Sequence, residues 1–77
     1  MSKQTNAIIN SIDVSTRRKR RQAAILAAAI LKRIQFSEAD YRDRIPDNLQ
    51  NGDAYLAADE AVDAIDEAVC AVLGIYD

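Results

Sequence analysis

The stretch YLAADEAVDAIDEAVCAVLGIY, residues 55–76, decides the fold of this chain. Apolar side chains recur in it at alternating spacings of three and four residues, which is the period of one face of a helix. We name this face the seam, and its members are Tyr55, Ala58, Val62, Ile65, Val69, Val72 and Tyr76. The pattern predicts a helix that buries the seam against a neighbouring element.

Carboxylates follow the opposite face of the same predicted helix. This acidic stripe consists of Asp59, Glu60, Asp63, Asp66 and Glu67. It is either a solvated face or an electrostatic docking face that mimics nucleic-acid phosphates toward a protein. A magnesium site needs carboxylates that converge from facing helices, whereas these point away from the seam. We therefore expect no metal and no cofactor.

A second helix is predicted over residues 17–44, where only helix-compatible residues occur. One face of it is apolar and is the expected mate of the seam. The residues of that face are Ala23, Ala27, Ile30, Leu31, Ile34, Tyr41 and Ile45. Each helix is expected to bury the apolar face of the other.

The turn between them is predicted at residues 45–52. Pro46 ends the first helix, because proline lacks a backbone N–H and pushes the preceding residue out of the helical region. Leu49 is expected to plug the end of the hairpin, and Asp53 to cap a second helix over residues 53–74. Such a short connection makes the helices antiparallel neighbours.

Residues 1–16 are predicted to form an arm or a short separate helix. Ile8, Ile9 and Ile12 share one side of a helical turn. We favour a break at 13–16, because Ser15 or Thr16 can cap a new helix. The alternative is one continuous rod, since the chain has no glycine or proline before residue 46.

The fold class predicted is therefore all-α, an antiparallel helical hairpin. With 77 residues a two-helix core is marginal without further burial. We expect either a third, N-terminal helix or a homodimer that forms a four-helix bundle. The predicted oligomer contact lies on the first helix, about 180° from its seam-facing side, and comprises Ile25, Ala29 and Phe36.

Composition argues against catalysis and membrane insertion. The chain has no histidine, and its single cysteine, Cys70, is predicted to be a passive, partly buried thiol. The longest apolar run, residues 23–31, is far shorter than the roughly 20 residues that span a bilayer. We expect a cytoplasmic protein that is not an enzyme, with no small-molecule substrate and no membrane association.

The sequence RRKRR at residues 17–21 is the sharpest local feature. Three interpretations of this cluster are open: it binds nucleic-acid phosphates, it binds an acidic protein surface, or it is a solvated patch. The register of the hairpin predicts that it projects past the end of the second helix. The members of this basic cluster are Arg17, Arg18, Lys19, Arg20 and Arg21.

The turn IPDNLQ, residues 45–50, and the helix AVDAIDEA, residues 61–68, resemble small uncharacterised helical-hairpin proteins of bacteriophages, prophages and mobile elements. The basic, alanine-rich first helix departs from that family's usual acidic one. The resemblance implies a mobile-element origin and no enzyme activity, and it transfers no functional residues.

Together these observations predict a non-enzymatic interaction protein that binds a host or phage macromolecule, with antagonism of a host defence system as one form of that role. The alternative is a small nucleic-acid-binding protein that uses the basic cluster at residues 17–21.

Overall fold

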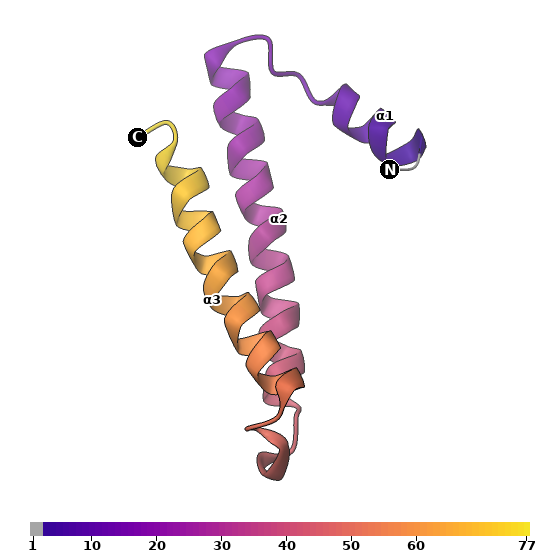
Figure 1. The fold of residues 1–77 in the computed structure, drawn as a ribbon. Coiled ribbons are helices and arrows are strands. Elements are labelled where there is room, and N and C mark those ends of the chain that lie inside the picture. Colours follow the sequence, from indigo (N-terminus) through magenta and orange to yellow (C-terminus); the bar gives the residue numbers. More distant parts are fainter. Residues whose placement is uncertain (1–2) are drawn as a thin grey trace.

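The computed structural model describes residues 3–77, and all regular secondary structure in this part of the chain is helical, without a strand (Figure 1). The all-α prediction is confirmed. The elements in chain order are α1 (Lys3–Ser11), α2 (Arg17–Asp43), the 3₁₀ turn η1 (Asp47–Leu49) and α3 (Asp53–Gly74).

Helices α2 and α3 run antiparallel side by side and form a hairpin (Figure 1). Their bounds agree within one residue with the predicted ranges 17–44 and 53–74. Helix α1 lies apart from the hairpin at the end of an extended linker. The molecule is therefore a two-helix hairpin with a separate N-terminal arm.

The predicted break between arm and hairpin is confirmed. Helix α1 ends at Ser11 and α2 begins at Arg17. Thr16 has an extended backbone, and its hydroxyl accepts a hydrogen bond from the Lys19 backbone N–H at 3.1 Å. This cap satisfies one of the unpaired N–H groups of the first turn, so a new helix starts here.

The arm itself differs from the prediction at its start. Helix α1 already begins at Lys3, whereas the apolar pattern that suggested a helix starts at Ile8. Four polar residues precede that pattern within α1, and none of them is a helix breaker. The predicted arm also includes Met1 and Ser2, which lie outside the described residues.

The seam of α3 is confirmed as the buried face. Ala58 and Val69 are buried, and the other five members are half-buried. Seam residues alternate three and four apart, so they remain on one line along the helix and can face one neighbour over its full length.

The predicted packing face of α2 is wrong for four of its seven residues. Ile30, Ile34 and Tyr41 were expected against the seam, but they are 54%, 48% and 53% exposed. Ala27 is also exposed, while Ala23, Leu31 and Ile45 are half-buried. The face that meets α3 is rotated about the helix axis, and its residues are Ala24, Ala28, Leu31, Gln35, Glu38 and Arg42.

Small size and polar pairing explain this rotation. Ala28 is buried, and together with Ala24 it lets the two helix axes approach closely. Gln35 donates from Nε2 to the Val62 carbonyl at 3.0 Å, and Arg42 pairs with Asp59 at 2.8 Å. The bulkier isoleucines consequently remain outside.

Backbone hydrogen bonds close the turn. The Leu49 N–H bonds to the Pro46 carbonyl at 2.8 Å, and the Gly52 N–H bonds to the Leu49 carbonyl at 3.0 Å. The Leu49 side chain is exposed, so it does not plug the hairpin as predicted. Gly52, and not Asp53, is the N-cap of α3; Asp53 lies in the first turn, where its charge complements the helix dipole.

We predict that Val69→Ala lowers the free energy of unfolding by about 1–3 kcal/mol, because it removes buried methyl groups and leaves a cavity. Leu73→Ala, at a more exposed position of the same helix, is expected to cost less although it removes more atoms. Urea unfolding followed by circular dichroism, at matched protein concentration, measures both. Equal costs would show that the seam is misassigned.

Candidate functional site

An unpartnered apolar surface is the main feature outside the hairpin core. On α2 it comprises Leu26, Ile30, Ile34 and Tyr41, all of which are roughly half exposed. A row of small residues on α3, repeating at spacings of four and three, accompanies it. We call the two rows together the apolar face; the α3 row consists of Ala57, Ala61, Ala64, Ala68 and Ala71.

Both rows lie on the same side of the hairpin. At about 100° per residue, the α2 row is turned roughly 100° from the side of α2 that meets α3. The alanine row is turned by a similar angle from the seam of α3. Viewed from the N-terminus of each helix, both rows are turned in the same sense from the side that packs. Because the two helices run in opposite directions, these rotations bring both rows to one side of the hairpin. The apolar face is therefore continuous across both helices.

The predicted oligomer contact lies on the other side of α2. Ile25, Ala29 and Phe36 are all exposed, and Phe36 is the most exposed large apolar residue, at 74%. Ile25 borders a shallow hollow at the open end of the hairpin, together with Leu73 and Tyr76. The structure does not join these three residues to the apolar face, and their role in assembly stays a prediction.

The basic cluster is exposed throughout, but three of its members have partners within the chain. Lys19 pairs with Asp13 at 2.6 Å, and Arg20 donates to the Val14 carbonyl at 3.1 Å. The Arg17 guanidinium lies 5.2 Å from the centre of the Tyr76 ring. Arg18 and Arg21 have no ion pair among the interactions of the described residues.

The contact between Arg17 and Tyr76 corrects one expectation. The cluster was predicted to project past the end of α3, but Arg17 lies over the Tyr76 ring, and Arg21 borders the same hollow as Tyr76. A guanidinium is attracted to the negative face of an aromatic ring. The attraction keeps the start of α2 beside the end of α3.

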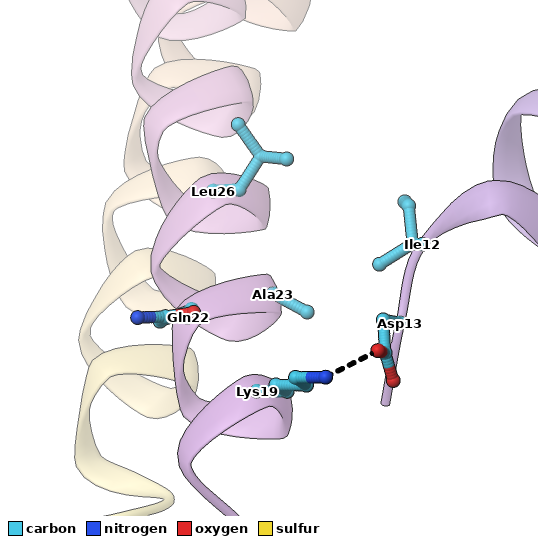
Figure 2. Close-up of a pocket in the computed structure, with 6 residues that line it drawn as sticks. All are labelled: Ile12, Asp13, Lys19, Gln22, Ala23 and Leu26. Carbon is cyan, nitrogen blue, oxygen red and sulfur yellow. Dashed lines mark hydrogen bonds and ion pairs between the residues drawn. The ribbon is translucent and has the colours of Figure 1, made fainter. Parts of the chain in front are cut away.

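A groove lies between the linker and α2, at the open end of the apolar face. Figure 2 shows Ile12 and Asp13 of the linker opposite Lys19, Ala23 and Leu26 of α2. The ion pair between Asp13 and Lys19 closes one end of this groove. The sequence analysis did not predict this ion pair, because Asp13 and Lys19 are six residues apart across a non-helical linker and such a spacing has no recognisable period.

Asp13 stabilises the start of α2. Hydrogen bonds from Lys19 and then from Ser15 lower the pKa of Asp13 from its ordinary value of 3.8 to about 2. The backbone N–H of Ser15 bonds to its Oδ1 at 2.9 Å. A carboxylate here also offsets the repulsion between the basic cluster and the positive end of the helix dipole.

The acidic stripe remains at the surface. Asp59 is half-buried and bonded to Arg42, whereas Glu60, Asp63, Asp66 and Glu67 are exposed. Hydrogen bonds to Asp59 and then Asp43 raise the pKa of Arg42 above its ordinary value. Within the described part of the chain, no three histidine, cysteine or carboxylate side chains are grouped to hold a metal ion.

Cys70 adjoins the acidic stripe and is exposed. The prediction of a partly buried thiol is wrong, because Cys70 lies outside the three-and-four spacing of the seam and turns away from α2.

The comparisons with other proteins give no relative for this chain. No protein-family model, curated protein or solved structure matches it. Among residues 3–77, no helix combines the length and apolar content needed to cross a membrane.

We predict that Lys19→Ala raises the pKa of Asp13 from about 2 toward 3.8, because the main hydrogen bond to the carboxylate is lost. Since the folded pKa is depressed, the contact stabilises the linker above pH 3.8 and is lost as the pH falls through about 2. Carbon-detected NMR titration of the Asp13 carboxyl measures this. Lys32→Ala, elsewhere on α2, is the control and should leave the titration unchanged.

Proposed function

We propose that this chain is a non-enzymatic interaction protein whose apolar face docks a helical protein. One observation carries the proposal: large apolar side chains of α2 stay half exposed in a row beside the alanines of α3. Contiguous exposed apolar surface in a small protein is typical of a binding site, and two-helix surfaces of this kind pack against further helices.

The lack of an enzymatic role is also part of the proposal. It is supported by the absence of histidine from the sequence and by the surface position of the acidic stripe. A general base needs a positioned group whose pKa lies near neutrality, and the carboxylate whose pKa shifts, Asp13, becomes more acidic.

The partner belongs to one of two kinds, a second copy of the chain or a different host or phage protein. Two hairpins joined through their apolar faces would make a dimeric four-helix bundle. The resemblance of residues 45–50 and 61–68 to phage and mobile-element hairpins supports action in the cytoplasm of a host cell, with antagonism of a defence system as one form. The acidic stripe would then face outward as a docking surface for a basic partner.

We predict that Ile30→Asp reduces capture of a partner protein from a bacterial lysate at least tenfold, because it buries an unpaired charge in the contact. Phe36→Asp is the matched control, since it places the same charge on the other side of α2. Quantitative mass spectrometry of cross-linked complexes measures both variants. Equal recovery of every protein with Ile30→Asp and wild type would contradict docking of a foreign protein on the apolar face.

Nucleic-acid binding is a second candidate, favoured by Arg18 and Arg21. Both are exposed, and neither has an ion pair among the interactions of the described residues. They belong to a cluster of five adjacent positive charges at one end of the molecule. Such a cluster is suited to contacts with phosphates that depend strongly on salt.

For this candidate we predict salt-dependent binding to random-sequence DNA and RNA. Replacing Arg18 and Arg21 by alanine should lower the slope of log affinity against log salt by about 2, because two phosphate contacts are lost. Fluorescence anisotropy at several salt concentrations measures the slope, with Lys32→Ala as control. The candidate is wrong if no binding occurs at low salt or if the double variant binds like wild type.

A further inference from the structure

We infer that the partner seated on the apolar face is a second copy of this chain, arranged so that the turn of one hairpin lies beside the basic open end of the other. The inference rests on the proposed function and identifies the occupant of the same site. Three observations support it: the exposed area, the distribution of charge along the hairpin, and the row of alanines.

The chain exposes far more surface than its mass warrants. Its accessible surface is 6186 Å², and only Ala28, Ala58 and Val69 form the buried apolar core of the described residues. A compact monomer of 8.5 kDa exposes about 4,700 Å² by the usual scaling with mass. The excess of roughly 1,500 Å² is spread over the separate arm, the linker and the apolar face. A standard interface takes about 800 Å² from each partner, so a dimer through the apolar face would bury part of this excess.

Charge is separated along the length of the hairpin. The open end carries the five positive charges of the basic cluster, and the acids near it are Asp13, which pairs with Lys19, and Asp77 at the end of the chain beside α3. The turn end, residues 38–60, holds seven acidic and two basic residues. Two copies that lie in opposite directions place unlike ends together, whereas two copies in the same direction place both basic clusters at one end.

The apolar face is also complementary to itself in this arrangement. A two-fold axis that reverses the direction of the helices sets each helix against its own copy. The alanine rows of two α3 helices then meet, and small side chains permit a close approach. The larger side chains of two α2 helices, Ile30 and Ile34 among them, interleave beside that contact. The residues that α3 leaves uncovered thereby become a core.

The first test is the mass of the full-length protein by light scattering at about 100 μM, above the micromolar dissociation constants of weak dimers. Wild type is expected to have twice the mass of the 8.5 kDa chain. Ile34→Ala should raise the dissociation constant on the order of 100-fold, because the side chain is lost from both copies. Ile34→Asp should be monomeric, and Phe36→Asp should remain dimeric.

Circular dichroism of each variant verifies that helix content is retained, and Ile34→Ala keeps the test valid if the aspartate variant unfolds. A monomeric wild type overturns the inference. So does a dimer that Phe36→Asp dissociates and Ile34→Asp does not, because the contact would then be the predicted set around Phe36.

The second test measures direction, using spin labels on Asn48→Cys in a Cys70→Ser background. In the arrangement we infer, the labelled turns lie apart by about the length of α2, roughly 40 Å for 27 residues. A separation under about 20 Å, or half that length, would indicate hairpins in the same direction and would overturn the inference.

Failure of the inference is distinguishable from failure of the proposed function. If the wild type is monomeric and Ile30→Asp abolishes capture of a foreign protein, the docking role stands and the inference that a second copy occupies the face fails. If the wild type forms the inferred dimer and Ile30→Asp leaves its contacts with foreign proteins unchanged, the inference stands and docking of a foreign protein at this face fails.

Discussion

The burial of small side chains between α2 and α3 is the constraint on which the rest of the structure depends. Ala28 of α2 and Ala58 of α3 are buried at two different levels of the hairpin, and at each level the small side chain permits a close approach of the other helix. These two contacts select the rotation of α2 about its axis. That rotation turns Ile30 and Ile34 to solvent, so the exposed apolar face is a direct consequence of how the hairpin packs.

Polar contacts across the hairpin fix the rotation that the alanines permit. Gln35 reaches the Val62 carbonyl, and Arg42 pairs with Asp59. Arg17 over Tyr76 holds the open end. These are surface or half-buried interactions of modest energy, but each has a defined geometry. They specify one arrangement of the two helices, while apolar burial supplies less stability here than in a larger domain.

The candidate sites show where sequence patterns succeed. The acidic stripe stayed at the surface because its residues share one side of a helix whose other side is buried, which the spacing alone reveals. The basic cluster was located, but its partners were not: Lys19 with Asp13, and Arg17 with Tyr76, join residues separated by a linker or by most of the chain. Such pairs have no local period.

The sequence by itself determined the two long helices, their turn near Pro46 and the buried seam of α3, because caps, breakers and periodicity act through near neighbours along the chain. It favoured a break at 13–16 but left a continuous rod open, and the structure decided for a new helix capped by Thr16. Only the tertiary structure decided which face of α2 meets that seam. The large residues at Ile30 and Ile34 and the small ones at Ala24 and Ala28 give two apolar faces on the same helix. The choice between them depends on distance and polar pairing between helices, which a one-dimensional pattern does not contain.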